Sequence, residues 1–475
     1  MSEETHHLLP PSSRSQSPSP QHAADQTEHT APTIDSSTHP RPVLLIPASH
    51  HGRKNLRIWA RIGLLVCGIS TLLLVAPVVA KYLLLLSFEQ TLVPFRSEQS
   101  ETEIDAQFTQ HCIQNATWTD VSEPPSNLES FSHVVEMSYD LPLSADLLYL
   151  TGRGALSHGK VRIVRDGARG SRSMAVHVSL AYDYAHMLGR IKVCLLRPQE
   201  GYHGVGVFSP TDLPYPARKY RTHFDVTIRL PPDADSLPTL VKRFESDMPL
   251  FSYQVDLPGD VALFDHLSLS TTNKPIIVKS LATNTAMIQT MNSRIEGTFS
   301  TSNYLTLRTL SAPIRANVRL FNANNSQQTQ LWMRTSNSEI NSTAELVSTS
   351  ANSTGGSFKV HARSSNAPLD IFTPVAPLGH VLDLTAETSN APTFVSLHST
   401  WEGVFHLLTS PFFKPAVDAD VSAPDPSGNR RRRRVHLANT NTNDVQGYAE
   451  WTPKERRAEG QLRVVTSNAP IHVTL

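Results

Sequence analysis

An apolar run from Ile62 to Ala80 constrains this chain more than any other feature of its sequence. The run holds no charged side chain, and after Lys81 the apolar character resumes through Leu86. As a helix, its roughly 19 residues would be about 28 Å long, close to the bilayer's hydrocarbon thickness of about 30 Å. A helix of a soluble core would carry a polar face, and this one has none. The sequence therefore predicts a transmembrane helix that contacts the lipid bilayer through Ile62–Leu86.

Flanking charge predicts the orientation of this helix. Arg53, Lys54, Arg57 and Arg61 precede the run, and acidic residues are frequent after it. A positive excess on the N-terminal side keeps that side cytoplasmic. The prediction is a single-pass type II protein with a signal-anchor, its C-terminus luminal or extracellular, in the plasma membrane or the secretory pathway. The alternative is a cleaved signal peptide, but about 60 residues precede the run and the run is too long for that class.

Composition divides the rest of the chain. Only 39% of the residues are hydrophobic, below the usual 45–50% or so of globular chains, so a sizeable part should lie outside any core. Residues 1–55 are rich in Ser, Pro, His and Thr and are predicted to form a disordered cytoplasmic tail. Residues 56–87 hold the transmembrane helix and its flanks. Residues 88–130 are polar and irregular and are predicted to be a stalk or linker.

Two mainly β regions are predicted after the linker. Residues 131–260 alternate apolar and polar side chains in runs such as Val161–Val164 and Val226–Leu230, which favours a β-sandwich-like domain. Residues 261–475 are predicted to form an irregular β-repeat domain of hairpins or stacked rungs. Within it, residues 415–434 are predicted to be a disordered loop. The chain ends in an expected strand, Ile471–Leu475, which should be built into the sheet.

The β-repeat prediction rests on a recurring Ser/Thr-Asn corner between short strands. The asparagine is expected to adopt a left-handed turn conformation and to bond its own backbone. The spacing is uneven, since Asn292 and Asn303 are 11 residues apart and Asn366 and Asn390 are 24 apart. Uneven spacing favours an open stack or a sandwich over a regular β-helix. The corners lie at residues 272–276, 291–295, 301–305, 335–340, 364–369, 388–393 and 466–471.

The Asn-Ala-Pro corners at Asn366, Asn390 and Asn468 carry a family resemblance. The chain resembles fungal membrane-anchored or secreted proteins of unknown function with an adhesin-like repetitive β domain, over roughly residues 130–475. The resemblance implies a β-strand repeat. It supplies no catalytic residue.

Three kinds of modification are suggested by sequence. Cys112 and Cys194 lie on the same side of the predicted membrane helix and can form a disulfide in an oxidising compartment; the alternative is two free thiols. The arginine run 430–434 is open to three interpretations: a solvated loop, a site of proteolytic processing, or a binding site for an acidic polymer or anionic lipid. The processing residues would be Arg430, Arg431, Arg432, Arg433 and Arg434. The N-glycosylation sequons begin at Asn115, Asn324, Asn341 and Asn352.

No catalytic or cofactor-binding motif occurs in the sequence. Asp265 and His266 are adjacent and should point to opposite faces of a strand, and Asp183 with His186 is expected to be surface decoration. A net charge of zero gives no electrostatic reason to expect nucleic acid. We therefore predict no enzyme, no cofactor and no metal, and a structural, adhesion or ligand-binding role with glycan or protein ligands. The alternatives are a luminal glycan-processing enzyme and a membrane anchor for a signalling tail.

Overall fold

The computed structural model of the chain describes residues 109–211, 221–232, 240–259, 263–323, 327–438, 440, 442–453 and 459–475. The predicted tail, the membrane span at 56–87 and the start of the predicted linker lie outside these residues. Within them, no helix is both long and apolar enough to cross a bilayer. All described residues belong to one compact unit, residues 96–475.

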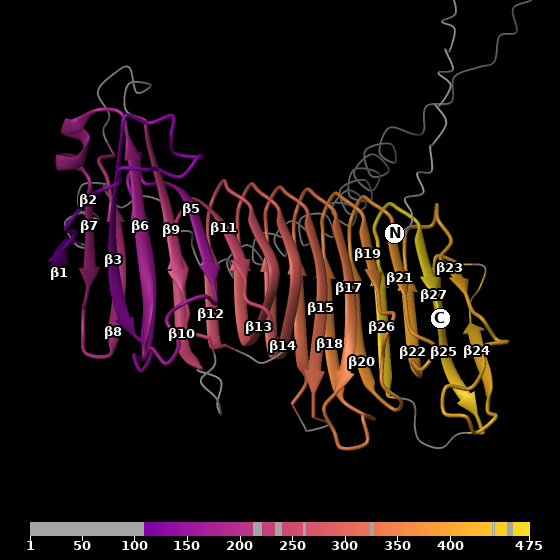
Figure 1. Cartoon of the computed structure of the whole chain (residues 1–475). Helices are drawn as coiled ribbons and strands as arrows, with labels where there is room; N and C mark the ends of the chain where they lie inside the picture. The colour runs from indigo at the N-terminus through magenta and orange to yellow at the C-terminus, as the bar shows by residue number, and fades with distance from the viewer. Residues whose placement is uncertain are drawn as a thin grey trace, which may run out of the picture. The chain divides into compact units, whose positions relative to one another are not determined.

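This unit is mainly β, as the sequence predicts. Its described strands form one continuous sheet that folds into two ladders, named here face A and face B, with mostly parallel neighbours (Figure 1). In spatial order, the parallel strands of face A are β8 (Tyr202–Phe208), β4 (Leu147–Arg153), β10 (Val241–Asp247), β12 (Phe264–Ser270), the second halves of β13 (Ile276–Gln289) and β14 (Ile295–Arg308), β16 (Thr329–Arg334), β18 (Ser357–Arg363), β20 (Val381–Glu387), β26 (Gly460–Val465) and β22 (Gly403–Leu408).

Face B is built in the same way, and β13 and β14 belong to both faces because they bend at their middle. The parallel strands of face B are β9 (Thr222–Arg229), β5 (His158–Val164), β11 (Leu250–Asp256), the first halves of β13 and β14, β15 (Ile314–Asn322), β17 (Ile340–Ser348), β19 (Leu369–Phe372), β21 (Thr393–Ser396), β27 (Ile471–Thr474) and β23 (Ala416–Asp418). One strand from each face, with the corner between them, makes one rung of the stack.

Antiparallel strands close both ends of the stack. On the N-terminal side they are β1 (Cys112–Asn115), β2 (Thr119–Asp120), β3 (His133–Pro142), β6 (Ser173–Tyr182) and β7 (Lys192–Leu196), with a short 3₁₀ helix, η1 (Ala185–Arg190). On the C-terminal side they are β24 (Arg432–Ala438) and β25 (Asp444–Thr452). The predicted linker therefore ends earlier than expected, because β1 and β2 already pair with the sheet.

The order of rungs departs from chain order at the C-terminal end. The last rung, β26 with β27, lies between β20/β21 and β22/β23. The final strand β27 is thus paired on both sides, which confirms the prediction that the chain's end is built into the sheet.

One hydrophobic core fills the space between the faces and continues across residue 260. Its main feature is a column of branched aliphatic side chains, each following a corner. The column is formed by Ile276, Ile295, Ile314, Ile340, Leu369 and Ile471, each at most 1% exposed. Burying one such side chain contributes about 1.5–3 kcal/mol, so the column is a large part of what holds successive rungs together.

The Ser/Thr-Asn corners are stacked, and the stacking explains their asparagines. The Asn292 amide donates to Asn273 (2.8 Å), Asn366 to Asn337 (2.9 Å), Asn390 to Asn366 (2.8 Å) and Asn468 to Asn390 (2.9 Å). The expectation of left-handed asparagines was wrong: among the described non-glycine residues only Ser353 and Arg430 have positive φ. Asparagine is used because its amide both donates and accepts along the stack.

The position two residues before each corner asparagine, or before Ser311 in a further corner that has serine instead, is equally regular. It holds a buried hydroxyl that donates to corner carbonyls, for example from Thr309 to Met291 (3.2 Å) and from Thr335 to Ala312 (3.3 Å). These residues are Thr271, Thr290, Thr309, Thr335, Ser364, Thr388 and Thr466, each at most 5% exposed. The hydroxyls satisfy carbonyls that the turn removes from the β ladder.

Candidate functional site: a hollow on face A

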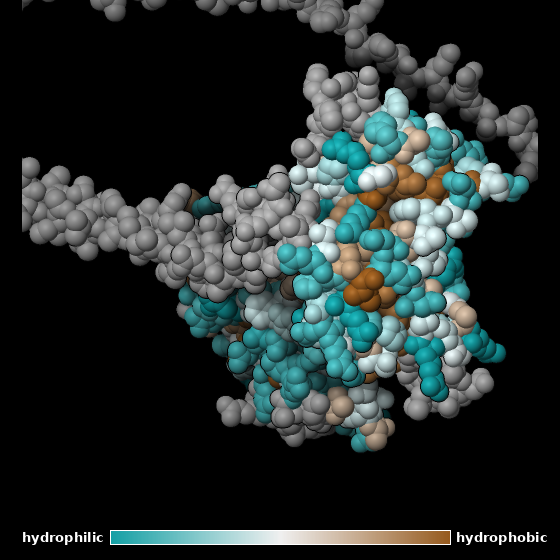
Figure 2. All heavy atoms as spheres, turned by 90° about the vertical axis from the view of Figure 1, so that its left-hand side faces the viewer, coloured by the Kyte–Doolittle hydropathy of each residue, from teal (hydrophilic) through white to brown (hydrophobic). Residues whose placement is uncertain are grey.

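A hollow of about 310 Å³ opens on the outer side of face A, near the N-terminal end of the stack. Its floor is formed by the adjacent strands β8, β4 and β10. Figure 2 views this end of the stack and shows hydrophobic patches on a mostly hydrophilic surface. The lining residues are His111, Leu147, Tyr149, Leu150, Thr151, Arg153, Leu196, Pro198, Tyr202, Glu245 and Asp247.

Glycines create the room for the aromatic wall. Gly204 lies across from Tyr149 in the parallel register, and a Cβ at Gly204 would meet the Tyr149 ring at 2.5–2.6 Å. The ring can therefore lie against the backbone of β8. Burial raises the pKa of Tyr149 to about 12, so its hydroxyl stays neutral at physiological pH.

The charged groups of the hollow are paired. Arg153 donates to the Asp247 carboxylate (2.6 Å) and to the carbonyls of Gly152 (2.8 Å) and Asp247 (3.2 Å). Glu245 accepts from the Nε of Arg243 (2.6 Å). The hollow therefore offers hydrogen-bonding groups with little net charge.

One polar group in the hollow lacks a partner. Thr151 is 5% exposed, and its hydroxyl oxygen has no hydrogen bond within the described part of the chain. Buried polar groups are nearly always hydrogen-bonded, so an orphaned hydroxyl on the wall of a hollow calls for a water or a ligand.

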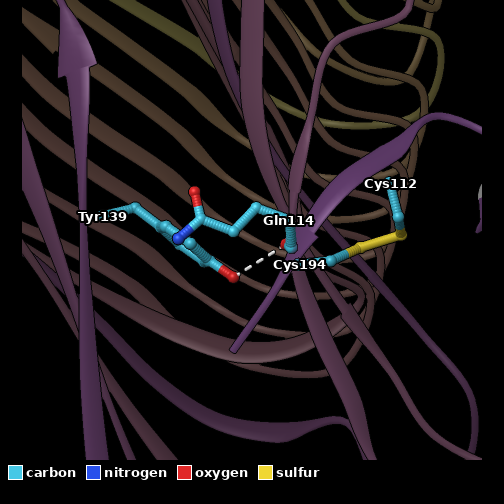
Figure 3. Close-up of a disulfide and its surroundings, with 4 residues drawn as sticks. All are labelled: Cys112, Gln114, Tyr139 and Cys194. Carbon is cyan, nitrogen blue, oxygen red and sulfur yellow. Dashed lines mark hydrogen bonds between the residues drawn. A yellow bond between two sulfur atoms is a disulfide. The ribbon is translucent and has the colours of Figure 1, made fainter. Parts of the chain in front are cut away.

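A disulfide holds one wall of the hollow in place. Cys112 and Cys194 are bonded, with Cα atoms 5.6 Å apart (Figure 3). The bond ties the short strand β1 to β7, and the Tyr139 hydroxyl donates to the Gln114 carbonyl of β1 (3.0 Å). His111 directly precedes this bridge, so the bridge fixes where the imidazole meets the hollow.

The predicted glycosylation sites are distributed over the stack. Asn115 is exposed at the end of β1, Asn341 is exposed on β17, and Asn352 is exposed in the turn after β17. Asn324 lies outside the described residues. The three described sequons are accessible, and their use stays a prediction.

The arginine run differs from its prediction. Residues 415–434 were expected to be a disordered loop, but Arg432 begins β24 and the inward-facing Arg431 and Arg433 are 8% and 5% exposed. Arg433 donates to the Trp401 carbonyl (2.7 Å), and both inward guanidinium groups lie over the Trp451 ring. Alternation along a strand is what separates the run into buried and exposed arginines.

Arg431 is further held by acidic groups. It donates to Asp425 (3.1 Å) and lies 3.6 Å from Glu402. Burial lowers the pKa of Arg433 to about 10, although the nearby Glu402 opposes this shift. Proteolytic processing at 430–434 stays a prediction, but a protease would first have to separate β24 from β25.

One of the two acid–imidazole neighbours differs from expectation. Asp265 and His266 lie 3.2 Å apart, whereas strand alternation was expected to separate them. Both residues lie outside the core, between the buried Phe264 and Leu267, and Asn284 donates to Asp265 (3.0 Å). Asp183 accepts from the Ser132 amide (3.4 Å) and lies 3.6 Å from Arg221.

Sequence reasoning missed the hollow altogether. Its side chains come from β4, β7, β8 and β10 and from residues beside these strands, and only the register places Tyr149 beside Glu245. The one local signal was the alternation Arg243, Glu245, Asp247 on the outward side of a strand. No group of three His, Cys, Asp or Glu side chains suited to a metal ion occurs in the residues that the structure describes.

Comparisons with known proteins add little. No protein-family model matches the chain, and no curated protein matches it. Among solved structures, a candidate cell adhesion protein from Clostridium sporogenes is similar at 6% identity and a TM-score of 0.16, covering 71% of this chain and 98% of its own. A candidate adhesin from Parabacteroides merdae is similar at 12% identity and a TM-score of 0.20, covering 53% and 95%. Such TM-scores support no conclusion about ligand or activity.

Proposed function

We propose that the chain is a single-pass type II membrane protein whose β-repeat ectodomain binds a saccharide in the hollow on face A. The role would be adhesion or ligand binding at the cell surface or in the secretory lumen. The observation that carries the binding proposal is the orphaned Thr151 hydroxyl on the wall of an aromatic-lined hollow.

The chemistry of the hollow favours a neutral sugar. Tyr149 and Tyr202 supply aromatic surface for the apolar face of a pyranose ring. Arg153, Asp247 and Thr151 supply donors and acceptors for its hydroxyls, and the balanced charges favour no ionic ligand. Small-molecule sites typically combine an apolar hollow with a few placed polar groups.

Membrane placement is supported by two features. The apolar run 62–86 is the predicted anchor, and the Cys112–Cys194 bridge suits a compartment that is oxidising, such as the lumen or the outside of the cell. The resemblance to fungal membrane-anchored proteins agrees with this placement.

Substituting Thr151→Val tests the binding proposal. The purified full chain is first screened on a glycan array, and the best saccharide is then titrated against wild type and variant. Losing one ligand hydrogen bond should weaken binding about fivefold to tenfold, since such a bond contributes about 1 kcal/mol. The melting temperature should not fall, because no protein hydrogen bond is lost.

The matched control is Thr393→Val, which removes another buried, unpartnered hydroxyl that lies far along the stack. It should bind the saccharide as wild type does. The proposal fails if no saccharide binds, or if Thr151→Val binds as tightly as wild type.

One observation favours the enzymatic alternative. Glu245 and Asp247 lie two residues apart on the outward side of β10, and both line the hollow. Glycan hydrolysis needs a pair of carboxyl groups, one of which donates a proton. Each carboxylate here accepts a hydrogen bond from an arginine, which favours binding over proton donation. Hydrolysis of the bound saccharide that is lost in Glu245→Gln would establish the enzyme instead.

A further inference from the structure

Two phenylalanine rings are exposed on the outer side of face B, toward the C-terminal end of the stack. Phe372 is the last residue of β19, and Phe394 is the second residue of β21, the next strand of the same face (Figure 1). Each is 45% exposed. Both alternate with buried residues along their strands, so the rings point away from the core. Exposed apolar area that is gathered on one face, rather than scattered, often marks an interaction site.

A glycosylation sequon lies next to this pair of rings. Its asparagine, Asn341, is exposed on β17 and is paired with Asp370 of β19. Its threonine, Thr343, is paired with Phe372. Asp370 is paired on its other side with Phe394. Since strands are about 4.8 Å apart and residues rise about 3.3 Å along a strand, the Cα of Asn341 lies about 8 Å from that of Phe372 and about 10 Å from that of Phe394. Sugars bonded to Asn341 can therefore reach both rings.

The polar side chains between the sequon and the rings are free to interact with a sugar. In the part of the chain that the structure describes, no group hydrogen-bonds to or pairs with the Asn341 amide or the Asp370 carboxylate. The free amide is accessible for modification. The free carboxylate can accept a hydrogen bond from a sugar hydroxyl or from an N-acetyl N–H.

We propose that Asn341 carries an N-linked glycan whose first sugars lie over Phe372 and Phe394 and cover these rings. In the modification, the amide nitrogen displaces a polyprenyl diphosphate from C1 of a lipid-linked oligosaccharide. The N–C1 bond forms, the C1–O bond breaks, and the amide nitrogen loses one proton. The apolar face of an N-acetylhexosamine ring fits against a phenylalanine ring, and Asp370 accepts a hydrogen bond from the sugar.

This proposal rests on the luminal location in the proposed function, because the oligosaccharide is transferred to the chain in the lumen. Transfer precedes folding, so the place of Asn341 within a sheet does not hinder it. The sequon at Asn352 offers a contrast in the same chain. It lies in the turn after β17, where residues 349–356 have only small and hydroxyl-bearing side chains beside the asparagine.

Hydroxyl-radical footprinting measures the coverage of the rings. The full chain is purified from eukaryotic cells, and peptide mass spectrometry identifies which sequons carry glycans. The oxidation rates of Phe372 and Phe394 are then compared before and after an amidase removes the glycans from the folded protein. Covering one face of a ring removes roughly half of its accessible area, so both rates should rise about twofold on removal. The rate at Phe412, which is 91% exposed in the turn after β22, should not change.

Two variants assign the coverage to one sequon. Asn341→Gln should raise the oxidation rates of Phe372 and Phe394 about twofold, as the amidase does. The matched control Asn352→Gln removes the sequon in the turn and should leave both rates at the wild-type level. A melting curve for each variant verifies that the fold is intact. The amidase-treated wild type separates loss of the sugar from any change that the substitution makes in folding.

Four results would overturn the proposal. These are an Asn341 without a glycan, unchanged oxidation rates after the glycan is removed, an equal rise in Asn352→Gln, and rates that depend on protein concentration instead of the glycan. The last result would assign the rings to contact with a second copy of the chain. Glycans at Asn115 or Asn352 without one at Asn341 would leave the proposed luminal location standing, whereas a chain without any glycan would count against that location as well.

Discussion

Substitution of Asn366 by alanine tests whether the corner asparagines act through the stack or through their own backbone. Asn366 donates to Asn337 (2.9 Å) and accepts from Asn390 (2.8 Å). Each exposed hydrogen bond contributes about 0.5–1 kcal/mol, so Asn366→Ala should lower the free energy of unfolding by about 1–2 kcal/mol. Asn468→Ala removes one such bond in this ladder (2.9 Å) and should cost about half as much.

The assay is urea unfolding of the purified full chain, with the midpoint compared at unchanged slope. Asn317→Ala is the matched control, because Asn317 is exposed on β15 and lies outside the corner ladder. A glycine at position 366 distinguishes the two explanations. If Asn366 were left-handed, glycine would relieve its backbone strain and stabilise the chain. A stabilising Asn366→Gly would therefore refute the stacking explanation. An Asn366→Ala variant as stable to urea as Asn317→Ala would refute it too.

Three further outcomes are expected. Arg433→Gln should lower the free energy of unfolding by about 2 kcal/mol, since a charge-assisted hydrogen bond and a cation–π contact are lost. Trypsin should cut the arginine run in this variant and should not cut it in wild type. Gly403→Ala should destabilise by about 2 kcal/mol or more, because the new Cβ would lie 2.2 Å from the Gly460 carbonyl oxygen; thermal unfolding measures it, and an unchanged melting temperature would contradict it. Burial lowers the pKa values of His158 and His223 from 6.5, and the neighbouring His223 lowers that of His158 further. The unfolded chain therefore takes up protons first, and stability should fall as the pH drops below about 6.5. Unfolding midpoints measured from pH 7.5 to 5 should show this fall in wild type and a smaller fall in the double variant His158→Asn with His223→Asn.

The sequence predicted the strands and the corners but not how rungs follow one another. A strand, turn and strand can form a hairpin or one rung of a parallel stack, and alternation alone does not distinguish them. The Ser/Thr-Asn pattern predicts that Asn292 and Asn303 form successive corners of one kind. They belong to different corners, since Asn292 pairs with Asn273 whereas Asn303 donates to Thr285 (3.2 Å).

Inserted segments hid the true spacing. Asn390 and Asn468 are 78 residues apart and yet are neighbours in the corner ladder. The strands β22–β25 fill the interval, so no fixed period could be read from the sequence. The hollow was missed for the same reason, because it depends on side chains that only the register of distant strands brings together.

Local composition misled in the arginine run. Five consecutive cations are typical of a solvated loop, but alternate side chains of a strand point inward. The inward Arg433 lies over the Trp451 ring, and the inward Arg431 is paired with Asp425 and Glu402. The division into two domains at residue 260 stays a prediction. Among the described residues, one hydrophobic core continues across this position.

The side of the membrane on which residues 109–475 lie is the most direct test of the account, because a ligand-binding ectodomain requires a luminal or external location. The measurement is protease protection with glycosidase treatment of the tagged full chain in microsomes. The account predicts that the part after residue 88 is protected and that its band shifts on deglycosylation, through Asn115, Asn341 or Asn352. A C-terminal part that is digested and does not shift would contradict the type II topology and, with it, the extracellular ligand proposed for the hollow.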